Sequence, residues 1–130
     1  MNIPNSKIRK AYISALPQYQ IYDIAVPNDV QTPNLYITIN NVTLNEYENY
    51  KEGHEWQSAT SLNIWHVNEK GFVSSVNLEE VANDIINTPI NIDGFKLQHR
   101  EMFDCKQFEP IKTDSSTIER MVIIFKHWVV

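Results

Sequence analysis

The segment formed by residues 117–130 constrains the fold of this chain more than any other part of the sequence. It is dense in β-branched and aromatic residues and closes on Val129 and Val130 without a polar tail. Such a composition is typical of a strand paired deep in a sheet. A bare apolar strand end would promote aggregation of a free monomer, so we expect the rest of the fold or a neighbouring copy to cover it. The segment indicates assembly rather than chemistry, and Val129 and Val130 become candidate subunit-interface residues.

Length and composition predict a single globular domain over residues 1–130, since 42% of the residues are hydrophobic. The formal net charge of -5 disfavours binding to a phosphate backbone by charge. Cys105 is the only cysteine, which excludes an intrachain disulfide and favours a reducing compartment. No signal-peptide core and no membrane-length apolar run can be found. We therefore expect a soluble protein that is made in the cytoplasm and has no membrane partner.

Hydrophobic periodicity and turn signals predict the order helix, strand, long hairpin, helix, hairpin and strand. We expect an α+β fold, with a mainly antiparallel β-sheet, a long extended hairpin arm and two flanking α-helices. The expected helices are residues 6–16 and a segment that begins after Asn77 and stops at Thr88-Pro89. The expected strands are 19–25, 35–44, 55–67, 90–92, a strand from 95 to about 108, and 117–130, with a tight turn at Asp93-Gly94.

The polar stretch at residues 45–54 separates the two central strands and forms the tip of the expected hairpin arm. It carries Tyr47 and Tyr50, and Trp56 follows it. Large, stiff aromatic side chains of this kind anchor protein interfaces. We therefore treat the arm as a contact element, with Tyr47, Tyr50 and Trp56 as candidate interface residues. The alternative for Trp56 is that it lines a ligand groove.

No pattern of catalytic or metal-ligating residues can be found in the sequence. The four histidines lie too far apart for two ligands on one helix face or in one zinc knuckle. His66 and His127 each follow a tryptophan, and we expect outward imidazoles beside core indoles. Cys105 is expected to be a semi-buried spectator thiol, and the three glycines fit turns rather than a phosphate-binding loop. We predict no catalytic residue, no cofactor and no metal.

Taken in order, several segments resemble the tail-terminator (tail-completion) proteins of tailed bacteriophages and the related neck-ring proteins. The Arg-Met-Val-Ile-Ile-Phe run after the acidic turn at Asp114 carries most of the likeness. The other segments are the helix at 8–16, the proline-bounded stretch 26–33 with Tyr-Ile-Thr-Ile after it, the arm, the helix at 81–86 and Ile-Asp-Gly-Phe at 92–95.

This resemblance implies a structural virion protein without enzymatic activity. Such proteins form a ring, commonly six-fold, at the neck or tail end, with head-side and tail-side protein partners and genome DNA passing through the lumen. The protein would be assembled in the host cytoplasm and reside in the virion. An alternative is a cytoplasmic adaptor or ligand-binding module without catalytic activity; an enzyme is the third option.

Overall fold

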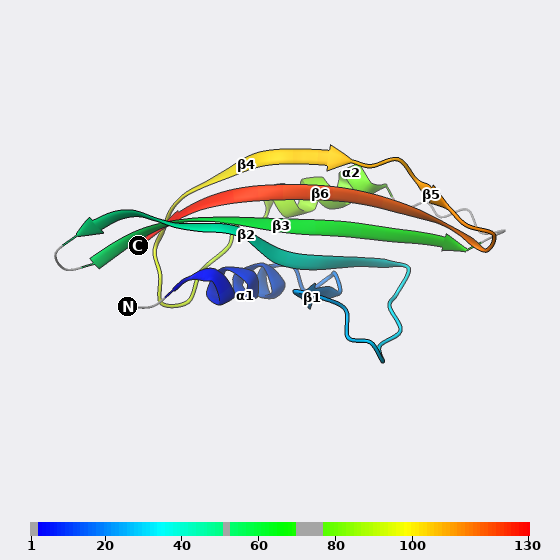
Figure 1. Ribbon diagram of the computed structural model, residues 1–130, viewed down its shortest axis with the longest axis horizontal. Coiled ribbons are helices and arrows are strands. Elements are labelled where there is room, and N and C mark those ends of the chain that lie inside the picture. The colour runs from blue at the N-terminus through cyan, green and yellow to red at the C-terminus, as the bar shows by residue number, and fades with distance from the viewer. Residues whose placement is uncertain (1–2, 51–52, 70–76) are drawn as a thin grey trace.

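The computed structural model describes residues 3–50, 53–69 and 77–130, and for 46–50 and 53–54 it describes the backbone alone. Figure 1 shows long strands with two helices packed along them. The elements are α1 (Asn5–Ala15), β1 (Ile21–Asp23), β2 (Leu35–Tyr50), β3 (Gly53–Glu69), α2 (Leu78–Asn87), β4 (Leu97–Gln107), β5 (Ile111–Lys112) and β6 (Ser116–Val129). This arrangement confirms the expected α+β class.

One mostly antiparallel sheet connects all the strands, in the order β1-β2-β3-β6-β4, and β5 pairs with β6. Among the described strands, only β1 runs parallel to its neighbour, β2. β6 lies between β3 and β4, so the rest of the fold covers the apolar C-terminal segment, which was one of the two expected ways of covering it. The β2–β3 hairpin continues past the end of β6, because β6 pairs with β3 only from Trp56 to Glu69. Figure 1 shows this arm projecting beyond the C-terminus.

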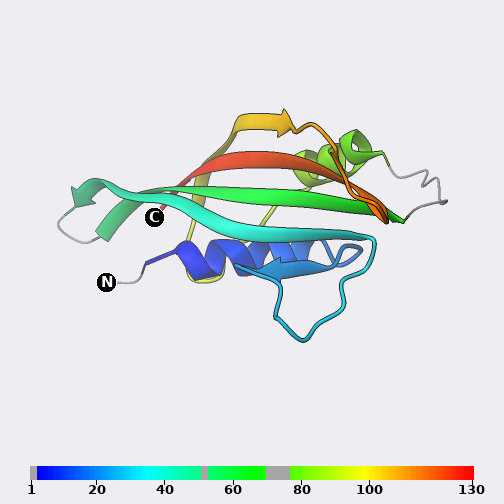
Figure 2. The ribbon, with the colours of Figure 1, turned by 45° about the vertical axis from the view of Figure 1, so that its right-hand side comes forward.

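Both helices pack against the same face of the sheet. α1 contributes Ile8, Ala11 and Tyr12 to the core, and α2 contributes Leu78, Val81, Ala82 and Ile85. Their partners are inward residues of the long strands, including Ile37, Ile39, Leu62, Ile64, Ile123 and Phe125. Figure 2 shows α1 lying along β2 and α2 behind β6. No helix of the described chain covers the opposite face of the sheet.

Local signals explain where the second helix begins and where the following turn forms. Asn77 caps α2, since its Oδ1 accepts a hydrogen bond from the backbone N–H of Glu79 at 2.9 Å. Gly94 has φ +79°, in the left-handed region that favours glycine. However, the prediction of a local hairpin around this turn was wrong for residues 90–92. They form no strand, and β4 pairs with β6 instead.

The prediction for the two histidines was also wrong, because the imidazoles face the core. His66 is 1% exposed and His127 is 0% exposed, whereas Trp65 and Trp128 lie half-buried on the uncovered face. Neighbouring side chains do point to opposite faces of the sheet, as expected, but the histidines rather than the tryptophans point to the core. His127 can be buried because hydrogen bonds satisfy its ring: Nε2 lies 2.6 Å from the Tyr12 hydroxyl.

The second ring nitrogen of His127, Nδ1, lies 3.0 Å from the carbonyl oxygen of Ser58. Because a carbonyl can only accept, Nδ1 carries the proton and Nε2 accepts from the Tyr12 hydroxyl. Burial is the main reason that the pKa of His127 falls to about 4; Arg100 nearby lowers it further, while the Ser58 bond opposes the shift. Burial likewise raises the pKa of Tyr12. This network holds a neutral imidazole between α1, β3 and β6.

Candidate subunit interface

The sheet has a bare backbone edge on each side. β1 pairs only with Ile37, Thr38 and Ile39 of β2, so residues 40–50 of β2 have no partner strand on that side within the described chain. On the other side, β4 pairs with β6 along one edge, and no described strand lies along its second edge. Unpaired N–H and C=O groups in such rows are templates for a strand of another chain. The two edges are different surfaces of the same molecule.

Each bare edge carries a bulge with an exposed apolar residue. Val42 is the extra residue between Asn41 and Thr43 of β2 and is 53% exposed. Phe103 is the extra residue between Met102 and Asp104 of β4 and is 59% exposed. Bulges at sheet edges redirect side chains. Both bulges therefore present an apolar group to solvent at a sheet margin.

Ile24 lies where β1 ends and the bare edge of β2 begins. Its backbone N–H donates to the carbonyl oxygen of Ile39 at 2.8 Å, next to the first unpaired residue of β2. Its φ is +72°, and the N–H of Ala25 donates to the oxygen of Asp23 at 2.9 Å, which closes a γ-turn around it. A γ-turn with positive φ is rare, and for a β-branched residue this backbone is strained. The Ile24 side chain is nevertheless 54% exposed.

Two of the predicted interface residues lie on the arm. Tyr47 lies at a register shift in β2, and Tyr50 pairs with Gly53 of β3. Their side chains lie outside the described part of the structure, so their role stays a prediction. The prediction that the tip at 45–54 separates the strands was wrong, since β2 runs to Tyr50 and β3 begins at Gly53. These polar segments can continue as strands because β2 and β3 pair with each other, which satisfies the backbone groups that lie between them.

The other predicted interface residues belong mostly to the core. Trp56 is 7% exposed and Val129 is 0% exposed, so neither side chain offers a contact surface. Both are buried because they pair across β3 and β6 on the helix-covered face. Val130 is 36% exposed, and its backbone exchanges two hydrogen bonds with Lys96. Among these, only Val130 presents a side chain to solvent.

A continuous row of rings crosses the uncovered face of the sheet. The Tyr22 and Tyr36 rings are 5.9 Å apart, and the Tyr36 and Trp65 rings 6.3 Å apart. The Arg120 guanidinium then lies 4.8 Å from the Trp65 ring centroid and 4.6 Å from that of Phe108. The sequence reasoning missed this row, although its members alternate with core residues along their strands. Tyr36 and Trp65 are stacked, and Tyr22 meets Tyr36 edge to face. Because the rings contact one another in this way, the row stiffens the sheet rather than offering open stacking platforms.

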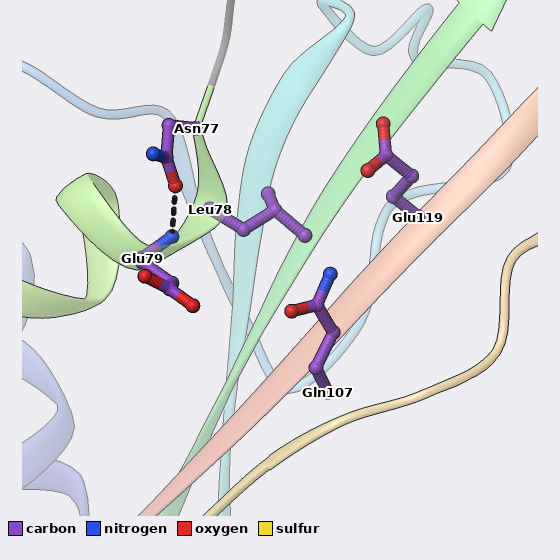
Figure 3. Close-up of a pocket in the computed structure, with 5 residues that line it drawn as sticks. All are labelled: Asn77, Leu78, Glu79, Gln107 and Glu119. Atoms are coloured by element: carbon purple, nitrogen blue, oxygen red, sulfur yellow. Dashed lines mark hydrogen bonds between the residues drawn. The ribbon is translucent and has the colours of Figure 1, made fainter.

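A pocket of about 380 Å³ lies beside the start of α2, as Figure 3 shows. Its lining residues are Asn77, Leu78, Glu79, Gln107 and Glu119. The Glu119 carboxylate already has partners within the chain: its Oε1 lies 3.1 Å from Nδ1 of His66 and accepts a hydrogen bond from the Asn68 amide at 3.0 Å. Within the described residues, no group of three or more His, Cys, Asp or Glu side chains could hold a metal ion. The pocket lining includes no nucleophile paired with a base.

Cys105 lies on the exposed strand β4 and is more accessible than the semi-buried thiol that we expected. Partial burial and the neighbouring carboxylates of Asp104 and Glu79 raise its pKa. A thiol with a raised pKa holds less of the reactive thiolate. The site thus gives Cys105 no activation as a nucleophile, although a thiol reagent can reach it.

Neither described helix is long and apolar enough to cross a membrane. No family model matches the sequence, and no curated protein matches it. Solved structures do resemble the fold. One of them, a protein without a functional name, has 14% sequence identity and a TM-score of 0.51, with 94% of each chain covered. At this identity the likeness shows the fold alone, across nearly the whole chain.

Proposed function

We propose that this protein is a structural subunit of a ring at the neck or tail end of a tailed bacteriophage, where it joins the head connector to the tail. The observation that carries the proposal is the sheet with two different bare edges and a projecting β2–β3 arm. A contact between two different surfaces of identical subunits is head-to-tail, and such contacts close into a ring when the rotation allows it.

The remaining parts of the proposal follow from the resemblance and from charge. The ring, six-fold in the commonest arrangement of the resembled proteins, presents one face to head-side proteins and the other to tail-side proteins. Genome DNA passes through the lumen without specific binding. The net charge of -5 supports this, because a negatively charged subunit does not attract the DNA phosphates. The subunit is assembled in the host cytoplasm and resides in the virion.

Native mass spectrometry and negative-stain electron microscopy of the purified protein test this proposal. We expect a closed oligomer of the 15.2 kDa chain. The double variant Tyr47→Ala, Tyr50→Ala should impair oligomerisation, because it removes the large aromatic side chains of the arm. The control Tyr47→Phe, Tyr50→Phe keeps the rings and should still oligomerise. Only monomers at micromolar concentration, together with absence of the protein from purified virions, would refute the proposal.

A further inference from the structure

We infer that β4 of one copy pairs with the bare edge of β2 of the next copy, so that the sheet continues from subunit to subunit around the ring. This inference rests on the proposed function and names the two surfaces in contact. The occupant of each edge is thus a second copy of the chain. Ile24 and Val42 on one side, and Met102 and Phe103 on the other, supply the apolar contacts of this joint.

The two edges match in length and direction. The bare part of β2, residues 40–50, is as long as β4, which has 11 residues. Following the antiparallel pairs from β2 through β3 and β6 to β4, the two edge strands run in opposite directions. Rotation about an axis along the strands preserves these directions in every copy. β4 and the neighbouring β2 therefore meet as an antiparallel pair, the more stable kind of strand pairing.

Both edges also offer apolar surface for the joint. Val42 and Ile24 are 53% and 54% exposed at the β2 edge, and Met102 and Phe103 are 44% and 59% exposed at the β4 edge. The Lys126 ammonium lies 4.0 Å from the Phe103 ring centroid and contacts one side of that ring. Strand addition satisfies the backbone groups, while side chains along the edge supply specificity.

The strained turn at Ile24 is an independent observation that points to a contact at this place. Glycine, which has no Cβ, would adopt this backbone with less strain. A β-branched side chain there makes the turn harder to form, and in the single chain half of that side chain faces solvent. Strained residues persist where the strain serves a function. Contact with Met102 and Phe103 of a neighbouring copy would bury the Ile24 side chain, which the isolated chain leaves exposed.

Chemical cross-linking tests the joint directly. Asn41 lies on the bare edge of β2, pairs with buried Thr60 and is partly exposed. Its buried side-chain oxygen has no hydrogen-bond partner, so Asn41→Cys removes no bond of that oxygen. Cys105 pairs with buried Ile123, on the same helix-covered face. Treatment of Asn41→Cys with a short bis-maleimide should join this cysteine to Cys105 of the next copy. A denaturing gel should then show a covalent ladder that extends beyond the dimer.

Two controls separate this inference from the proposed function. The unaltered chain has Cys105 alone, and Ser14→Cys places a second thiol at an exposed position of α1 rather than on a strand edge. Neither protein should give the ladder. Cross-linking that stops at the dimer in the unaltered chain would mean that two β4 edges meet, which overturns the inference. A ring in the microscope without a ladder would overturn the inference and leave the proposed function standing. Monomers under all conditions would refute both.

A second variant distinguishes a contact role of Ile24 from a structural one. Ile24→Gly should raise the urea midpoint of the chain, because glycine has no Cβ to strain a γ-turn with positive φ, and should weaken assembly at least several-fold in sedimentation. Val30→Gly is the matched control, an exposed apolar residue of the same loop without positive φ. It should lower the urea midpoint slightly and leave assembly unchanged. A urea midpoint of Ile24→Gly no higher than that of Val30→Gly, or unchanged assembly for Ile24→Gly, would overturn this assignment.

Discussion

Acidification should destabilise this protein through one buried side chain, His127. The imidazole is 0% exposed, and its pKa falls from 6.5 to about 4 in the folded chain. Between these two values the unfolded chain binds a proton that the folded chain does not. Because the folded pKa is depressed, the stabilising contribution is complete above pH 6.5 and is lost as the pH falls toward 4.

The size of the effect follows from the difference between the two pKa values. Each pKa unit corresponds to about 1.4 kcal/mol, so the complete shift is worth on the order of 3 kcal/mol. Roughly 2 kcal/mol of this should be lost by about pH 5. Few domains of this size tolerate such a loss without a visible change, since the total stability is about 5 to 15 kcal/mol.

Urea unfolding at a series of pH values measures this contribution. The unfolding free energy of the unaltered chain should fall more steeply with acidification than that of His127→Gln, which has no group that titrates at this position. Ser58→Ala is the control, because it keeps the carbonyl oxygen that accepts from Nδ1 of His127 and should keep the steep dependence. If His127→Gln and the unaltered chain lose stability in parallel, the assignment of a neutral, buried His127 is refuted.

Two further predictions concern the ends of elements. Arg100 donates to the backbone oxygens of Ile86 and Thr88 at 2.7 and 2.9 Å. Arg100→Ala should therefore lower the unfolding free energy by about 2 to 4 kcal/mol, and Arg100→Lys should lower it less. Equal urea midpoints for the two variants and the unaltered chain would contradict this role. Gly94→Ala should cost about 1 kcal/mol through its backbone conformation, since nothing lies within 4 Å of an added Cβ. Gly94→Asn should cost less, and the reverse order in thermal unfolding would show that space rather than φ decides.

The sequence alone was sufficient for the elements whose signals are local. The alternation at 35–44 predicts β2, the Asn77 cap and following apolar spacing predict α2, and Asp93-Gly94 predicts the turn, because each signal depends only on backbone preferences of neighbouring residues. The fold class follows from their order. The apolar composition of residues 117–130 likewise requires a covered strand, which β6 is.

The candidate interface could not be read from such signals. A period-two pattern indicates which residues share a face of the sheet but not which of the two faces meets the helices. For this reason the prediction placed Trp65 in the core and His66 outside it, whereas His66 is buried. The exposure of Phe103 results from a bulge that arises only when β4 pairs with β6.

Tertiary structure alone decided the positions of Ile24 and of the two bare edges. A positive φ at isoleucine opposes local preference, so no sequence pattern predicts it, and an edge is defined by the partner that a strand lacks. Local residue patterns therefore predicted most of the helices and strands and their order. Long-range strand pairing determined which backbone groups and apolar side chains remain available to another copy, because that choice depends on contacts between residues far apart in the chain.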